Sequence, residues 1–173
     1  MNEVFYINIK ALTGTAMLLA IALVAQRLRL LFPFIPPQVS VFVIGSVVSA
    51  TYVLATWRFG VKYGLLLAWI TPIVAYLQGM LPIAPLILIT GLGTSVYVVL
   101  VYVLRHKLLW LLVGVSALCR MVVLYVGALL LLQFLHITGP KTVPILMAFS
   151  WPQLVTSTLG IGMAMVVMKR YTN

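Results

Sequence analysis

The sequence predicts an all-α membrane protein in which six transmembrane helices form one compact bundle. The chain has 173 residues, of which 64% are hydrophobic and 7% are charged, and this composition is typical of integral membrane proteins. The apolar residues gather into runs of about twenty, the length that spans a bilayer. Short segments containing proline, glycine or basic residues separate these runs. Residues 1–173 are therefore expected to form a single membrane domain.

The six spans follow from the apolar runs and from the residues that interrupt them. The segment RLRLLFPFIPP ends the first run, because its three prolines cannot continue a helix. The polar turn HITGPKTVP separates the last two runs. In chain order the predicted helices are Ile9–Gln26, Gln38–Trp57, Gly64–Met80, Leu86–Leu104, Leu108–Leu135 and Ile145–Met168.

Lysine and arginine counts in the short loops predict the orientation. One side of the predicted bundle collects seven basic residues, and the other collects three, Arg27, Arg29 and Lys141. The richer side is expected to be cytoplasmic, which places both termini inside. The seven are Lys10, Arg58, Lys62, Arg105, Lys107, Lys169 and Arg170.

The charge balance and the missing residue types exclude several functions. The net charge is +10, with Glu3 as the single acid, and the bases stand at the ends of apolar runs. They fit membrane topology and anionic headgroups better than nucleic acid. No phosphate-binding GxxxxGK[ST] loop, hydrolytic triad or metal-ligand cluster is present. We expect no enzyme activity, no cofactor and no metal, so uphill transport would need energy from a partner chain.

The segment Gly64–Pro85 predicts part of a binding pocket. Its second half carries polar and helix-breaking residues, which survive in a bilayer where protein or water covers them. Tyr76 and Gln78 are the candidate ligand contacts here, with Gln78 favoured. Thr71 and Pro72 are expected to shape the pocket floor, and the Leu81–Pro85 turn is a candidate rim or lid.

Arg120 is the most unusual single residue. It lies twelve residues after Leu108, or about 18 Å along a helix, near the middle of a core about 30 Å thick. A central arginine costs about 2.5–3.5 kcal/mol on insertion scales, and no carboxylate in the predicted spans can pair with it. One interpretation is a clamp for a ligand carboxylate or phosphate. The other is a structural arginine bonded to the carbonyls of a broken neighbouring helix, or one that reaches the interface.

Further candidates for substrate binding come from polar and aromatic residues in the later helices. Trp151 and Gln153 flank Pro152, which would open the helix locally. The Trp151 ring could then stack against a ligand, and the Gln153 amide could form a hydrogen bond with it. Trp151 also fits the aromatic belt at the membrane interface. Weaker candidates are Thr90, Thr94 and Tyr125, since threonine often bonds its own helix and tyrosine often packs.

Small residues four apart mark faces where helices approach closely. Ala16 and Ala20 in AMLLA are one such pair, which predicts either a docking face for a separate membrane subunit or internal packing. Gly45 with Ser49 and Gly160 with Ala164 have the same spacing.

Taken together, these features resemble the substrate-binding S component of an energy-coupling factor vitamin transporter. The resemblance rests on six helices, internal termini, AMLLA in the first helix, GVKYGLLLAWITPIVAYLQG and SWPQLVTSTLGIGMAMVV. It covers nearly the whole chain.

The resemblance implies a protein of the bacterial cytoplasmic membrane that binds a water-soluble vitamin in an outward-facing pocket. Ala16 and Ala20 would meet the transmembrane coupling subunit, and two ATPase subunits would supply energy. The ligand stays open: Arg120 favours an anion such as pantothenate or lipoate, while pyridoxine and cobalamin are not excluded. Two alternatives are a membrane scaffold similar to MreD and a stand-alone solute facilitator.

Overall fold

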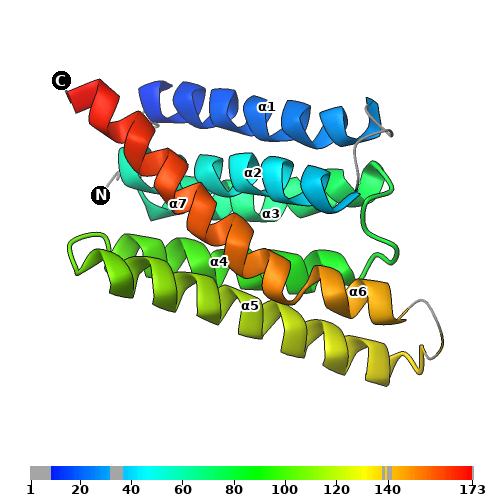
Figure 1. Ribbon diagram of the computed structural model, residues 1–173. Coiled ribbons are helices and arrows are strands. Elements are labelled where there is room, and N and C mark those ends of the chain that lie inside the picture. Colours follow the sequence, from blue (N-terminus) through cyan, green and yellow to red (C-terminus); the bar gives the residue numbers. More distant parts are fainter. Residues whose placement is uncertain (1–8, 32–36, 138, 140–141, 173) are drawn as a thin grey trace, which may run out of the picture.

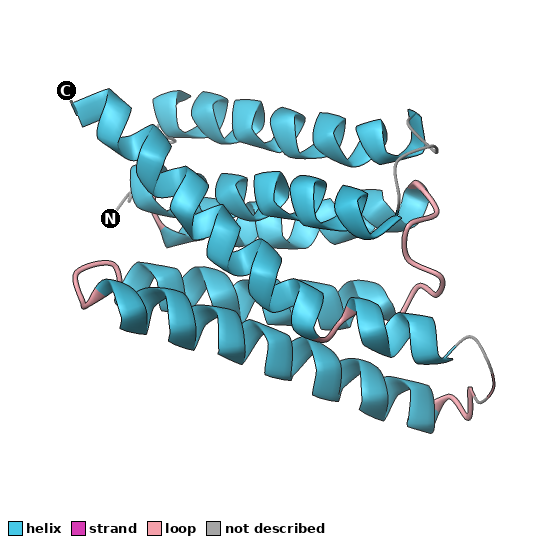
Figure 2. Cartoon of the chain, viewed as in Figure 1, coloured by secondary structure: helices cyan, strands magenta, loops and turns pink. Residues whose placement is uncertain are grey.

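The computed structural model describes residues 9–31, 37–137, 139 and 142–172, and these residues are almost entirely helical (Figures 1 and 2). No strand occurs among them, which confirms the all-α prediction. The helices, in chain order, are α1 (Ile9–Leu31), α2 (Pro37–Phe59), α3 (Val61–Leu77), α4 (Leu86–Val103), α5 (Leu109–Phe134), α6 (Thr142–Ala148) and α7 (Trp151–Thr172).

The prediction of one continuous helix over Ile145–Met168 is wrong, although the local opening predicted at Pro152 is present. The helical segment α6 ends at Ala148 and α7 begins at Trp151. Pro152 lies in the first turn of α7 and has no N–H with which to bond the carbonyl of Ala148, four residues earlier. The Gln153 side chain bonds that carbonyl instead, with Nε2 donating over 2.9 Å. The break therefore has a sequence cause and a compensating hydrogen bond.

Five stretches of the described chain are long and apolar enough to cross a membrane. They belong to α1, α2, α4, α5 and the combined α6–α7 region, whereas α3 has only 17 residues. A helix of that length measures about 25 Å, slightly less than a bilayer core. The turn that follows α3 returns the chain to α4 through residues 78–85.

The long helices lie roughly side by side, with α7 running diagonally across the others (Figure 1). Helix α2 is central and contacts α1, α3, α4 and α7, while α1 touches only α2 and α3 among the described helices. The close contact of α2 with α7 depends on small residues. A side chain at Gly160 would place its Cβ 2.5 Å from Cβ of Ser49, so these two helices meet almost backbone to backbone.

The basic residues gather at one end of this bundle, because successive long helices alternate in direction (Figure 1). We call it the basic end: α1 and α5 begin there, and α2, α4 and α7 end there. Arg27 and Arg29 belong to the opposite end of α1, and Lys141 lies outside the described residues. The basic end carries Lys10, Arg58, Lys62, Arg105, Lys107, Lys169 and Arg170.

The packed core lies mostly between the middle of the bundle and the basic end. Its largest fully buried side chains include Tyr97, Leu67 and Val101. A smaller apolar cluster at the opposite end contains Leu86 and Phe149, and Leu81 and Ile83 of the turn after α3 pack against it. The interior between these two clusters contains the polar groups described next.

Candidate functional site

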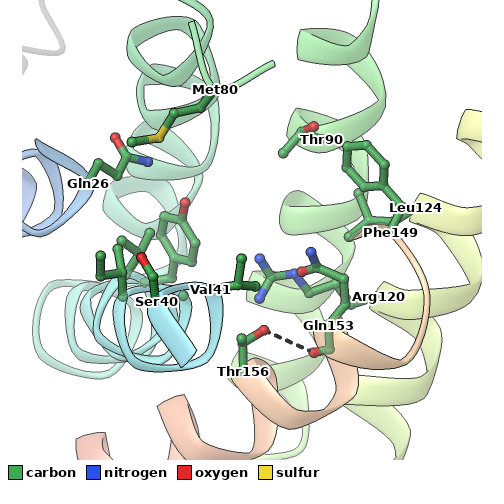
Figure 3. A pocket seen from close by; sticks show the side chains of 14 residues that line it. Gln26, Ser40, Val41, Met80, Thr90, Arg120, Leu124, Phe149, Gln153 and Thr156 are labelled. Atoms are coloured by element: carbon green, nitrogen blue, oxygen red, sulfur yellow. Dashed lines mark hydrogen bonds between the residues drawn. The ribbon is translucent and has the colours of Figure 1, made fainter. Parts of the chain in front are cut away.

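A cavity of about 180 Å³ penetrates the bundle from the end opposite the basic end. Two of its lining residues, Tyr52 and Arg120, belong to the central parts of α2 and α5. Figure 3 shows Arg120 with other lining residues around this space. Most other lining residues lie at helix ends or turns near the opening. They are Gln26, Ser40, Val41, Ile44, Gly45, Val48, Met80, Thr90, Leu124, Phe149, Gln153 and Thr156.

Arg120 connects helices on both sides of this cavity. Its side chain is 6% exposed, and its Nη1 donates to Ser49 Oγ at 2.9 Å and to Ser157 Oγ at 3.1 Å. The guanidinium carbon lies 4.9 Å from the centre of the Tyr97 ring and 5.9 Å from that of Tyr52. Both distances are within the range of cation–π attraction. Neither carbonyl bonding nor a reach to the interface accounts for this arginine.

The two tyrosines beside Arg120 are themselves held by hydrogen bonds. Tyr97 donates its hydroxyl to the Ser157 carbonyl oxygen at 3.0 Å. The hydroxyls of Tyr52 and Thr71 share a hydrogen bond of 2.5 Å, and Thr71 also donates to the Leu67 carbonyl at 2.8 Å. Thr71 does not line the cavity itself but holds the Tyr52 side chain that does. The network preorganises the guanidinium with little freedom to move.

The positive charge of Arg120 has no neutralising partner among the described residues. No acidic side chain occurs among the described residues, and Glu3, the one acid of the sequence, lies outside them. Arg120 Nε is buried and lacks a hydrogen-bond partner. Serine hydroxyls and tyrosine rings stabilise a cation only in part, whereas a carboxylate can bond a guanidinium through two parallel hydrogen bonds. The site can therefore receive an anion.

Three of the eight residues predicted to bind a substrate line the cavity: Thr90, Arg120 and Gln153. Thr90 donates to the Leu86 carbonyl of its own helix at 2.8 Å. Gln153 donates one N–H of Nε2 to the Ala148 carbonyl, which leaves the second N–H and the amide oxygen for other contacts.

The other five predicted contacts lie outside the lining of this cavity. Tyr76 and Tyr125 are exposed on the bundle surface. Trp151 is 56% exposed and packs against Phe42, with ring centres 5.4 Å apart. Gln78 and Thr94 each have a buried oxygen without a partner. Met80, two residues after Gln78, lines the cavity instead.

Several lining residues are not among the predicted ligand contacts. Ser40, Ile44, Val48 and Tyr52 are spaced four apart, which places them on one face of α2. That periodicity was a usable signal, but apolar residues also fill the other faces of α2. Gln26 was taken as the end of a helix, yet α1 continues to Leu31 and Gln26 is only 9% exposed.

Ala16 and Ala20 lie on the outer face of α1 and are exposed. Their neighbours Met17 and Val24 are also exposed, at 65% and 60%. The other two pairs of small residues behave differently, because Gly45 and Gly160 contact Thr156 and Ser49 across the α2–α7 interface. Internal packing therefore accounts for those pairs and not for Ala16 and Ala20.

Comparison with known proteins returns no match, whether to family models, curated proteins or solved structures. What the chain does must be argued from the cavity, its charge and its place in the bundle.

Proposed function

We propose that this chain is the substrate-binding subunit of an importer of the energy-coupling factor type in a bacterial cytoplasmic membrane. Its substrate is a small, anionic, water-soluble vitamin or related micronutrient. A separate transmembrane coupling subunit and two ATPase subunits supply the energy and release the substrate inside.

One observation carries this proposal: a buried arginine with no carboxylate partner in the described part of the chain lines a cavity that opens at one end of the bundle. A cation held at membrane depth is costly, and such residues usually mark a substrate path or site. A bound anion would recover much of that cost. The volume of about 180 Å³ is below the range of about 300–1,000 Å³ for drug-sized ligands, which favours a small substrate over cobalamin.

The direction of opening also supports import. The basic end is expected to face the cytoplasm, so the cavity would open to the outside, where a substrate is captured. Toward the basic end the path is blocked by the core, where Leu67 and Val101 are fully buried. This arrangement suits a binding subunit that needs a partner for release, and it disfavours a facilitator with a continuous path.

The membrane scaffold is the weaker candidate for a related reason. A scaffold similar to MreD would be expected to have a closed apolar interior, with Arg120 bonded to backbone carbonyls. Arg120 instead bonds two serine hydroxyls and lines an open cavity. Binding a solute explains this arrangement more directly.

A thermal-shift screen of the purified full chain against a vitamin panel tests the proposal. A ligand that binds the folded state stabilises it by mass action, by about 2.7 kcal/mol at a concentration of 100 Kd. We expect an anionic member of the panel to raise the melting temperature. If no member does so, the binding proposal fails and the scaffold becomes the better explanation.

A further inference from the structure

The mouth of the cavity holds a second set of polar groups that the Arg120 network does not use. Gln26 comes from α1 and Ser40 from the first turn of α2, and both line the cavity. Gln26 is 9% exposed and Ser40 is 6% exposed. Gln26 Oε1 and Ser40 Oγ are buried and have no hydrogen-bond partner.

Unpartnered oxygens of this kind need an explanation, because a buried polar atom without a hydrogen bond costs about 1–3 kcal/mol. Gln26 Oε1 is a pure acceptor, so only a donor can satisfy it. Ser40 Oγ can accept or donate. The groups at the mouth therefore call for an N–H or O–H group, while Arg120 calls for an anion.

The cavity lining between Arg120 and the two mouth residues, Gln26 and Ser40, is mostly apolar. Figure 3 shows Gln26 and Ser40 on one side of the open space, with Leu124 and Phe149 across from them. Arg120 extends from the side of Leu124 and Phe149 and belongs to the central part of α5. Ile44 and Val48 of α2 add apolar surface. A matching ligand has an apolar middle with polar groups at its two ends.

We propose that the ligand is a small monocarboxylate that carries an N–H or O–H donor at the end remote from the carboxylate. Arg120 binds the carboxylate, and Gln26 and Ser40 select the donor. This inference rests on the proposed function and narrows it. Pantothenate and biotin meet both requirements. Lipoate has a carboxylate tail like that of biotin, but its ring carries no donor, so it should bind more weakly.

Binding of four defined probes to the purified full chain, measured by calorimetry, tests the two ends separately. Pantothenate and pantothenol differ in having a carboxylate or an alcohol at one end, so their comparison tests the contact with Arg120. Biotin and lipoate share a five-carbon acid tail, so their comparison tests the donor. We expect pantothenate or biotin to bind at least about tenfold more tightly than lipoate, and pantothenate more tightly than pantothenol.

Variants at the mouth identify the residues responsible. We expect Gln26→Leu and Ser40→Ala each to weaken binding of the donor-bearing carboxylate by roughly tenfold and to leave lipoate affinity unchanged. Gln133→Leu is the matched control for glutamine, since Gln133 is exposed near the same end and lies outside the cavity. Ser95→Ala is the control for serine, because Ser95 Oγ is also buried without a partner but does not line the cavity.

The outcomes separate this inference from the function on which it rests. If lipoate binds as tightly as biotin and pantothenate, or if both mouth variants bind like their controls, the donor requirement is wrong and the anion site still stands. If none of the four probes binds the unaltered chain, this inference fails, while the proposed function still depends on the result of the full vitamin panel. Melting temperatures of the variants without ligand reveal any loss of folding. If Gln26→Leu folds poorly, Ser40→Ala still tests the inference, because it removes only one oxygen atom.

Discussion

Arg120 has two roles that a substitution must keep apart. Its Nη1 joins α2 and α7 through Ser49 and Ser157. The same side chain lines the cavity, where its charge would attract the proposed anion. Removing the whole side chain would leave both hydroxyls and a gap between the helices. A residue that keeps hydrogen bonding but loses charge therefore gives the cleaner test.

We expect Arg120→Gln to weaken binding of an anionic ligand by about 10- to 100-fold, since hydrogen bonds to charged groups contribute about 1.5–3 kcal/mol. Arg120→Lys should recover only part of the affinity, because lysine lacks the planar fork that matches a carboxylate. Calorimetry with the anion selected by the vitamin screen measures both. Arg27→Gln is the control, as Arg27 is exposed and outside the cavity. Equal binding by Arg120→Gln and the control would end the clamp hypothesis.

The residues of the candidate site differ in how well the sequence alone predicts them. Arg120 was predictable, because an arginine among apolar residues at mid-span has no ordinary explanation. Gln26 and Ser40 were not, because polar residues near helix ends are expected at an interface in any membrane protein. Gln78 and Met80 show the other limit: the helix predicted to continue to Met80 ends at Leu77, and Met80 lines the cavity in place of Gln78.

At the scale of elements, the α2–α7 contact depends on the absence of a side chain at Gly160. Its added Cβ would meet Cβ of Ser49 at 2.5 Å and the backbone nitrogen of Ala50 at 3.0 Å. Gly162, two residues later in α7, has nothing within 4 Å. The two glycines thus occupy the same helix with opposite surroundings.

Replacement by alanine is therefore expected to change the melting temperature differently at Gly160 and Gly162. Gly160→Ala should lower the melting temperature, because the crowded interface must separate at a cost of about 1–3 kcal/mol. Gly162→Ala should leave it unchanged or raise it slightly, since alanine gains up to about 1 kcal/mol over glycine in a helix. Thermal unfolding of the two purified variants measures both effects. Equal destabilisation by the two substitutions would contradict the close packing of α2 on α7.

The break between α6 and α7 makes a second prediction at this scale. In the presence of Pro152, Gln153 Nε2 bonds the otherwise free Ala148 carbonyl, so Gln153→Leu should cost about 1 kcal/mol of stability. In a Pro152→Ala background the backbone can form this bond itself, and the same substitution should cost less. A double-mutant cycle measured by thermal unfolding isolates the coupling. Additive effects would show that Gln153 does not compensate for the proline.

The elements themselves were largely predictable, and their ends were less so. Apolar runs bounded by prolines and basic residues located every long helix, because length and composition alone decide what can span a bilayer. A local opening was predicted at Pro152, but not two separate helices, because proline is also compatible with a kink inside one helix. Helix faces were the hardest feature, since runs that are apolar all round have almost no moment to read.

At the scale of the whole molecule, the uneven distribution of basic residues predicts orientation. His106 and His136 are exposed at opposite ends of the bundle. Cys119 is the one cysteine of the sequence, and its replacement by alanine leaves a single introduced thiol in each variant. In this Cys119→Ala background, we expect His136→Cys to react with a membrane-impermeant maleimide in intact cells and His106→Cys to react only after the membrane is opened. The reverse pattern would place the cavity mouth in the cytoplasm and remove the support for import.

The outer face of α1 is the surface on which the proposed coupling subunit would dock. Helix α1 contacts only α2 and α3 among the described helices, and Ala16 and Ala20 leave a shallow strip between exposed side chains such as Met17. Small residues let another helix approach closely, so Ala16→Trp should block a coupling subunit without reaching the cavity. Val122→Trp is the control, because Val122 is 50% exposed on α5.

We expect Ala16→Trp to abolish uptake of the bound vitamin in cells that hold the proposed ATPase and coupling subunits. The affinity of the Ala16→Trp variant for the vitamin in calorimetry should stay within about twofold of the unaltered chain. A surface substitution changes a free energy by up to about 0.5 kcal/mol, which corresponds to about this factor. The Val122→Trp chain should retain both activities. Lost binding in the Ala16→Trp variant would mean that α1 supports the cavity from within. Full uptake by that variant would place the coupling contact on another face, since a tryptophan on α1 leaves no room for a closely packed helix.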